Sequence, residues 1–339
     1  MSQDAQDPAV WRAAEEAGIH VMAIPTPFAV GRVNTYLIED DPLTLVDSGP
    51  NSGKALDELE RALADRGHRV EDLERIVVTH QHIDHEGLVS ILARRSGAEV
   101  CALDLLAPWL SGYAAETIAD DAFAQALMRR HGLPSDVITA LSGVSQAFRG
   151  WGAACEVTTL LTDGGELPFA DRTLAVHHRP GHSPSDTIFH DPQRGILLGG
   201  DHLIGHISSN PLISRPLDGT GLPPDRPRAL MTYLASMRRT QAMELDVILP
   251  GHGVPVTDHR ALIDDRIRLH DRRATKIAAL IAGQPLSAYE IAQSMWGNVA
   301  VTQAFLTLSE VLGHIDLLLA DGRAVEVDAD GEVARFRAT

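Results

Sequence analysis

Short apolar runs alternate with amphipathic stretches along most of the chain. Residues 18–47 hold three apolar, β-branched runs broken by Pro, Gly and Asp, which is typical of short strands. Leucine and alanine spacing predicts an amphipathic helix over 53–66. Strands are predicted at 74–80 and 98–103, with a helix between them at 87–97. Because strand and helix patterns keep alternating further along, the chain is predicted to be α/β or α+β with a substantial sheet.

The segment 104–154 departs from this alternation. It is helical by pattern, with breaks at 132–134 and 150–152, and it shows no strand signal. We therefore expect a helical insertion between two strands. Such an insertion either packs against the domain or covers a binding pocket, and the pattern leaves both interpretations open.

A different pattern begins at about residue 258. A long helix is followed by a second helix, whose start is marked by the capping-box pair Ser287 and Glu290. A third helix is predicted over 301–322, and a hairpin with Asp330–Gly331 at its turn closes the chain. Three helices followed by a hairpin is the element order of a winged-helix module. The predicted division is a catalytic domain over 1–257, with the insertion at about 104–154, and a winged-helix-like domain over 258–339.

Composition and charge narrow the classes of protein to which this chain can belong. Hydrophobic residues make up 44% of the 339 residues and charged residues 22%, as in globular proteins. The net charge of −17 argues against a broad grip on nucleic acid or on an anionic membrane, since both need a basic face. The two cysteines, Cys101 and Cys155, form neither a metal-type pair nor a disulfide framework. Without a signal-peptide pattern or a long apolar stretch, we expect a cytoplasmic protein that acts away from membranes.

One short segment is crowded with metal-binding side chains. THQHIDHEG, residues 79–87, places His80, His82, Asp84 and His85 within six positions, directly after a predicted buried strand. A solvated loop with chance histidines would explain this pattern, and so would half of a metal site. The choice depends on whether the rest of the chain supplies the other half.

Further potential ligands stand where predicted strands end. Asp47, His182, Asp201 and His252 each follow an apolar run and are flanked by Gly, Pro or Ser. A strand ending in a tight turn is a rigid way to present a ligand. Imidazole and carboxylate groups suit zinc and neighbouring divalent metals. The chain therefore supplies enough ligands for a complete site.

These ligands divide into two sets that share a bridging carboxylate. Two cations about 3.5–4 Å apart can lower the pKa of a water held between them and polarise a carbonyl or phosphoryl oxygen. We expect two divalent ions, Zn²⁺ in the first place, with iron or manganese as alternatives. The expected sets are His80, His82 and His182 for one ion and Asp84, His85 and His252 for the other, with Asp201 between them.

Taken in order, these elements resemble the metallo-β-lactamase-fold superfamily of hydrolases. The resemblance rests on Asp47, the HxHxDH of residues 80–85, then His182, Asp201 and His252, and it covers roughly residues 18–256. It implies an α+β fold: a four-layer αβ/βα sandwich with the metals at one edge. It also implies that Asp47 supports the metal cluster through hydrogen bonds without being a ligand. The C-terminal tail is similar to the superfamily branch with a winged-helix module, of the glyoxalase-II-like or β-lactamase-like protein 2 type.

Three functions compete on these residues. The first is hydrolysis of a thioester, ester or lactone, in which a metal-activated water attacks the carbonyl of a small acyl substrate and Asp84 or Asp201 handles the proton. The second is metal-dependent cleavage of an RNA phosphodiester, which needs positive charge and stacking surfaces, although aromatic residues are only 4%. The third is a winged-helix DNA-binding regulator, but its candidate recognition helix, 301–320, contains no Lys or Arg. We favour the first function.

Residues outside the metal set are candidates for substrate contact. His206 and Asn210 lie on a predicted loop just beyond Asp201, from which they could reach a substrate. The apolar face of 301–320 suits packing against another domain or against a second subunit, which leaves a homodimer open. The helical insertion is the expected source of apolar contacts, and its candidates are Trp109, Leu110, Tyr113, Phe123 and Met128.

Overall fold

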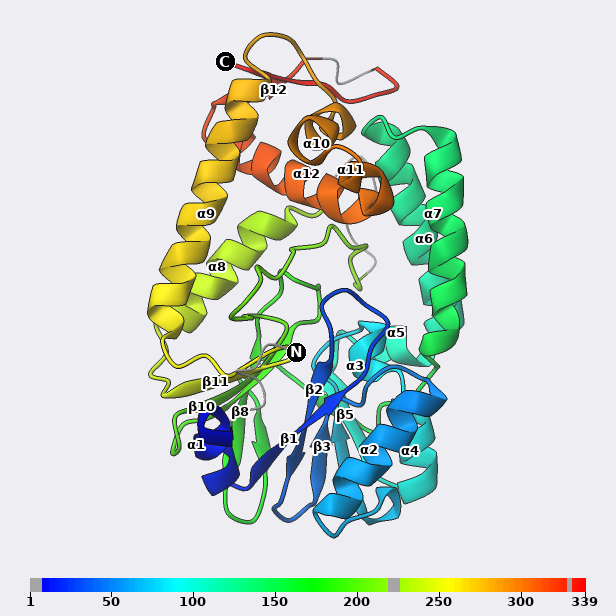
Figure 1. Cartoon of the computed structure of the whole chain (residues 1–339), viewed down its shortest axis with the longest axis vertical. Coiled ribbons are helices and arrows are strands. Elements are labelled where there is room, and N and C mark those ends of the chain that lie inside the picture. Colours follow the sequence, from blue (N-terminus) through cyan, green and yellow to red (C-terminus); the bar gives the residue numbers. More distant parts are fainter. Residues whose placement is uncertain (1–7, 219–225, 328–330) are drawn as a thin grey trace.

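Two β-sheets packed face to face, with helices on both outer faces, form the body of the molecule (Figure 1). The computed structural model describes residues 8–218, 226–327 and 331–339. This arrangement confirms the expected α+β class and the four-layer αβ/βα sandwich. Among the described residues, no helix combines the length and the apolar character needed to cross a membrane.

The first sheet combines an antiparallel and a parallel half. Its order is β1-β2-β3-β4-β5-β6. The pairs β1–β2 and β2–β3 are antiparallel, and the pairs from β3 to β6 are parallel. Its strands are β1 (Ile19–Ile24), β2 (Val33–Ile38), β3 (Thr44–Val46), β4 (Arg75–Val77), β5 (Glu99–Leu103) and β6 (Thr159–Leu161).

The second sheet is mainly antiparallel. Its order is β11-β10-β9-β8-β7, and only its β10–β11 pair is parallel. Its strands are β7 (Glu166–Pro168), β8 (Thr173–His178), β9 (Thr187–Asp191), β10 (Ile196–Gly200) and β11 (Val247–Pro250).

Apolar side chains fill the space between the layers. Tyr36 and Val77 of the first sheet meet Val176 and Phe189 of the second in one buried cluster. Separate clusters join each sheet to its outer helices, as expected when the two faces of a strand are both covered. The helices of the first sheet are α2 (Gly53–Asp65) and α4 (Val89–Ser96), and those of the second are α8 (Ala229–Gln241) and α9 (His259–Leu280), with α1 (Arg12–Glu16) preceding β1.

The segment between β5 and β6 is helical, as the sequence predicts. Phe123, Leu127 and Met128 from this insertion share one apolar core with Ile277 and Leu308 from the C-terminal part of the chain. The insertion is therefore packed against the C-terminal elements and not only against the sandwich (Figure 1). Its helices are α5 (Ala107–Ser111), α6 (Tyr113–Arg130) and α7 (Ser135–Phe148).

The C-terminal elements differ from the prediction in one helix. The helix expected over 301–322 is two helices, because the backbone leaves the helical region at Gln303 (φ −125°, ψ 42°). The capping box is present, with Ser287 Oγ accepting from the Glu290 amide at 3.2 Å. Asp330 of the predicted turn lies outside the described residues, so the winged-helix and domain assignments stay predictions. The elements are α10 (Ala288–Trp296), α11 (Val299–Thr302), α12 (Ala304–Ala320), β12 (Ala324–Glu326) and β13 (Phe336–Ala338).

Candidate metal centre

The crowded segment 79–87 lies at the carboxyl end of β4, in the middle of the first sheet. β4 is buried along its whole length, with β3 on one side and β5 on the other. The chain then turns into the short helix α3 (Ile83–Glu86), which carries Asp84 and His85. A buried strand and an immediate helix start thus hold the motif in place, as expected for ligands in an α/β sheet.

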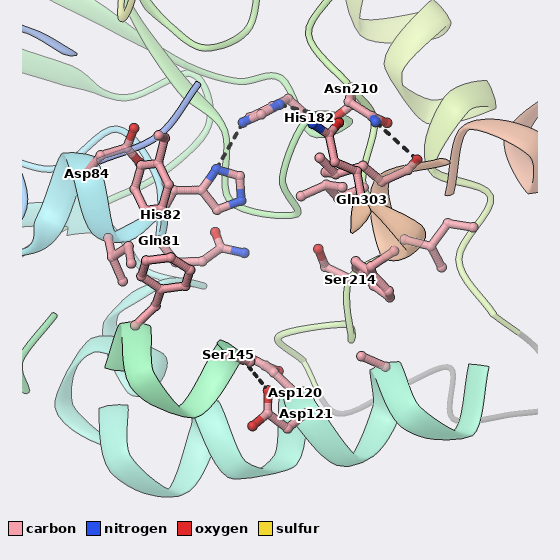
Figure 2. A pocket seen from close by; sticks show the side chains of 18 of the residues that line it. Gln81, His82, Asp84, Asp120, Asp121, Ser145, His182, Asn210, Ser214 and Gln303 are labelled. Carbon is pink, nitrogen blue, oxygen red and sulfur yellow. Dashed lines mark hydrogen bonds between the residues drawn. The ribbon is translucent and has the colours of Figure 1, made fainter. Parts of the chain in front are cut away.

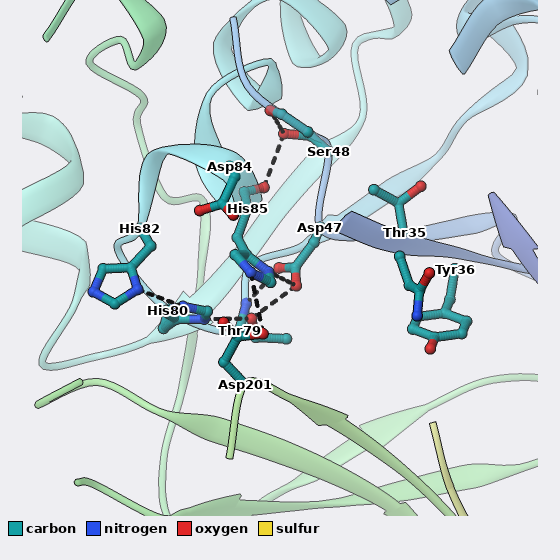
Figure 3. Close-up of polar contacts among 12 residues, drawn as sticks. Thr35, Tyr36, Asp47, Ser48, Thr79, His80, His82, Asp84, His85 and Asp201 are labelled. Atoms are coloured by element: carbon teal, nitrogen blue, oxygen red, sulfur yellow. Dashed lines mark hydrogen bonds and ion pairs between the residues drawn. The ribbon is translucent and has the colours of Figure 1, made fainter. Parts of the chain in front are cut away.

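Three histidine nitrogens converge at one point of this edge. His80 Nε2 lies 3.1 Å from His82 Nδ1, and His182 Nε2 lies 3.0 Å from the same His82 atom (Figures 2 and 3). Tetrahedral zinc with Zn–N bonds of 2.0–2.1 Å separates its ligand nitrogens by about 3.3 Å. The spacing of these three imidazoles therefore suits a single cation.

A second group of ligands lies beside the first and shares Asp201 with it. His252 Nε2 is 3.4 Å from Asp84 Oδ2, and His85 Nε2 is 3.4 Å from Asp201 Oδ1. Asp201 Oδ2 lies 3.5 Å from both His252 and His182. The structure thus brings all seven predicted ligands together, with Asp201 between the two sets.

Hydrogen bonds at the far side of the rings set the direction in which two of the histidines face. His182 Nδ1 donates to the backbone carbonyl of Asn210 at 3.1 Å, and His252 Nδ1 donates to the carbonyl of Arg32 at 2.8 Å. Each bond places the ring proton on the remote nitrogen. Nε2 is then the ring nitrogen that faces the cluster, and it is the atom available to a metal.

Asp47 holds the cluster from behind. Its carboxylate accepts from His85 Nδ1 at 2.7 Å and from the Thr79 amide and hydroxyl at 2.9 and 2.8 Å (Figure 3). The Thr79 hydroxyl in turn lies 2.9 Å from His80 Nδ1. Asp47 is also in the left-handed region with φ 58°, a strained conformation for a residue with a side chain. Its geometry is that of a residue that orients one ligand from each set.

Several buried atoms of the cluster have no hydrogen-bond partner among the described residues. His85 Nε2, His252 Nε2 and Asp201 Oδ1 all belong to this group. Leaving buried polar atoms unpaired costs free energy, so a partner is expected for them. Imidazole nitrogens and a carboxylate oxygen facing one point fit a divalent cation, which would take the place of the ring protons.

The electrostatics of the cluster point the same way. Burial opposes the charge of Asp201, but His252 and His85 outweigh it and hold its pKa well below the usual range. Burial lowers the pKa of His252, yet Asp201 overcomes this and raises it to about 10. Burial and the neighbouring His182 lower the pKa of His82 to about 3. The carboxylates thus attract positive charge, and His82 is neutral and able to bind a cation.

Two features of the site escaped the sequence analysis. Asn34 donates from its side chain to the carbonyls of Pro250 and Gly253, at 2.9 Å each, and so fastens the turn that carries His252. At Gly251 an added Cβ would collide with Asp201 Oδ1, so this turn needs a glycine. A polar Asn in a fully buried strand was the available signal for the first feature.

The cluster opens into a cavity of about 830 Å³. Asn210 lines this cavity, whereas His206, the other predicted contact residue, packs its ring over Gly253 and is not among the lining residues. Leu110 of the insertion does not line it either. The remaining walls are mostly apolar, and the insertion contributes Trp109, Tyr113, Phe123, Ala124, Met128, Leu141, Val144 and Phe148.

A second buried group of histidines lies in the C-terminal part. His270 Nδ1 is 3.2 Å from His314 Nε2, and His314 Nδ1 donates to the carbonyl of Glu310 at 2.6 Å. The Glu310 carboxylate forms an ion pair with Arg273. These three residues are close enough together to hold an ion, but their contacts with one another already use most of their polar atoms.

Comparison with known proteins agrees with this geometry. The family model of the metallo-beta-lactamase superfamily matches residues 29–252, which include all the predicted ligands. The chain belongs to this superfamily. A probable metallo-hydrolase of Bacillus subtilis, YqjP, is 32% identical over 314 residues, covering 93% of this chain and 96% of its own. The chain is thus a superfamily hydrolase with a cluster of histidines and aspartates suited to divalent metals.

Other members of the superfamily resemble parts or all of the chain. The human acyl-coenzyme A thioesterase MBLAC2 is 32% identical over 136 residues, 37% of this chain and 39% of its own. A beta-lactamase domain protein from Burkholderia ambifaria has 27% identity and a TM-score of 0.79, over 95% of this chain and 92% of its own. A metallo-beta-lactamase family protein from Thermus thermophilus shares the fold, with a TM-score of 0.78 and 24% identity over 95% and 99%.

Proposed function

We propose that this protein is a dinuclear metal-dependent hydrolase of acyl thioesters, with esters and lactones as related substrates. One observation carries the proposal: the ligand cluster lies at one end of a large cavity whose other walls are mainly apolar (Figure 2). A cavity of about 830 Å³ lies within the range of roughly 300–1,000 Å³ of small-molecule sites. The partial similarity to an acyl-coenzyme A thioesterase supports the same choice.

Two bound divalent cations, with Zn²⁺ as the expected metal, would polarise the substrate carbonyl and lower the pKa of a nearby water. The chain itself supplies the proton acceptor. Burial opposes ionisation of Asp84, but His85 and His252 lower its pKa, so the carboxylate is charged at neutral pH. Asp84 also lines the cavity. We assign it to receive the proton of the attacking water and return it to the departing thiolate, while Asp201 holds the two ligand sets together.

The charges that line the cavity favour RNA cleavage less than they favour thioester hydrolysis. Outside the ligand cluster, the charged side chains that line the described cavity are Asp120, Asp121, Arg149 and Arg215. Arg215 pairs with Asp120 at 2.8 Å, and Arg149 pairs with Asp121. Both cations are thus neutralised, whereas a phosphodiester backbone needs cations that are free to bind it.

DNA binding by α12 conflicts with the position of that helix. Twelve of its seventeen residues are buried, including Glu310, His314 and Asp316. It packs against α8, α9 and α10. A recognition helix must expose one face to the major groove, and this helix is enclosed by its neighbours.

The test combines metal analysis with a substrate panel. The panel holds acyl-CoA and glutathione thioesters, lactones, a phosphodiester and single-stranded RNA. We expect about two metal ions per chain, with hydrolysis of thioesters and no cleavage of RNA. Cleavage of the phosphodiester or RNA alone would contradict the proposal, and so would a reconstituted protein that holds no metal.

A further inference from the structure

We propose that the start of α12 and the apolar faces of α6 and α7 form a binding site for the acyl chain, and that these walls together limit its length. This inference deepens the proposed function and rests on it. Figure 2 shows the arrangement: His82 and Asp84 lie at one end of the pocket, and Gln303 lies on a side wall close to His182 and Asn210. Asp120, Asp121 and Ser145, from α6 and α7, lie across the pocket from the ligands. The residues on that side wall are Thr302, Gln303, Ala304, Phe305 and Leu306.

Large apolar side chains are exposed on three sides of the cavity. Val144 of α7 is 51% exposed, Leu306 of α12 is 38% exposed, and Ile207 on the loop after Asp201 is 37% exposed. All three line the cavity, although they come from segments far apart in the sequence. Apolar surface gathered in this way marks a place where apolar matter binds, because covering it is favourable.

The charges of the cavity favour an uncharged occupant beyond the metal end. Asp121 accepts from Ser145 Oγ at 2.7 Å and pairs with Arg149 (Figure 2). Asp120 accepts from Trp109 Nε1 at 2.9 Å as well as from Arg215. Each carboxylate is thus matched by an arginine and a neutral donor, so a bound carboxylate or phosphate would find no free cation there. A hydrocarbon chain needs no cation to bind.

Hydrogen bonds tie this side wall to the metal end. The Asn210 side chain donates to the carbonyl of Leu306 at 3.2 Å, while its backbone carbonyl accepts from the ligand His182. The amide of Ile213 donates to Ser309 Oγ at 3.3 Å. The position of the wall relative to the ligands is therefore fixed by the fold. A fixed wall is needed if the cavity is to discriminate between acyl chains of different length.

The size of the effect follows from apolar burial. Each methylene transferred from water contributes enough to raise affinity roughly three- to fourfold. We expect kcat/KM for straight-chain acyl-CoA thioesters to rise by about this factor per added methylene and then to level off. The chain length at which it levels off is where the acyl chain meets the wall.

Two substitutions test the wall, each with a matched control. Ala124→Trp places a large ring on the cavity side of α6, whereas Ala122→Trp places it on the exposed side of the same helix. Leu306→Glu puts a charge on the side wall, whereas Val299→Glu puts it on an exposed residue that does not line the cavity. We expect both cavity variants to shift the preferred acyl length downward and to weaken long chains at least tenfold, with both controls unchanged.

A binding measurement separates this inference from the proposed function. A fluorescent polyene fatty acid is titrated into the metal-free full chain and into each variant, after thermal unfolding has confirmed that the variants fold. We expect saturable binding in the wild type and in both controls, and binding at least tenfold weaker in Ala124→Trp and Leu306→Glu. An unchanged length profile and unchanged binding in both cavity variants would overturn the inference while leaving thioester hydrolysis intact. Fatty-acid binding without hydrolysis of any thioester would instead overturn the proposed function.

Discussion

Two buried groups of histidines lie in this molecule, and they differ in where their polar atoms find partners. At the sheet edge, the remote ring nitrogens of His182 and His252 are anchored, and the facing nitrogen of His252 has no hydrogen-bond partner among the described residues. In the C-terminal part, the facing nitrogens of His270 and His314 contact each other at 3.2 Å, and the unpartnered nitrogen is the remote Nε2 of His270. Nearness of potential ligands is common to both groups. Facing atoms that remain unpaired distinguish a place for an ion from a place for packing.

The largest effect is expected at the first ligand set. In His82→Ala we expect loss of bound metal and a fall in kcat/KM for an acyl thioester of roughly a thousandfold or more, because the cations supply several kcal/mol of transition-state stabilisation. Elemental analysis and steady-state kinetics measure both. His190→Ala, on β9 outside the ligand set, is the control and should retain metal and activity. A folded His82→Ala protein with full activity would contradict the assignment.

A smaller effect is expected when the support of the ligands is changed. Asp47→Asn keeps the size of the side chain but removes the charge that orients His85. We expect metal affinity or activity to fall roughly 10- to 100-fold. Competition with a coloured chelator measures the affinity. Asp40→Asn, which breaks a buried ion pair with Arg172, should lower stability instead and leave metal affinity as in the wild type. Equal losses in both variants would argue against a special role for Asp47.

The C-terminal histidines should affect stability in acid. Burial lowers the pKa of His270 to about 4, below the value of about 6.5 for an unfolded histidine. The unfolded state therefore binds more protons between these values, and stability falls as the pH falls through this window. His270→Gln should reduce the loss of unfolding free energy between pH 7 and pH 5 by about 2 kcal/mol relative to wild type. Urea unfolding at both pH values checks this, and parallel losses in the two proteins would refute it.

No change in metal content is expected when the C-terminal histidine group is altered. In His314→Gln we expect the metal content to equal that of the wild type, because both His314 nitrogens already have partners and Glu310 pairs with Arg273. The measurement is elemental analysis after reconstitution with zinc. Loss of one ion per chain in this variant would show that unpaired facing atoms are not needed to recognise a metal site.

Local patterns in the sequence determined the element types and the ligand set. The helix over 53–65 follows from leucine spacing, and the start of α10 follows from the capping box at Ser287. His80, His82 and Asp84 lie within five positions of the chain, and the strand before them fixes where they stand. Periodicity and turn chemistry depend only on residues close together in the chain, so they can be recognised from the sequence alone.

Contacts between distant segments were decided only by the tertiary structure. Asn34 meets the carbonyl of Pro250 across 216 positions, and Leu306 reaches the metal end through Asn210. Tertiary structure also decided that the last long helix breaks at Gln303 and that His270 contacts His314. Each depends on how whole layers pack, and packing sums many weak contacts that no short window of sequence contains.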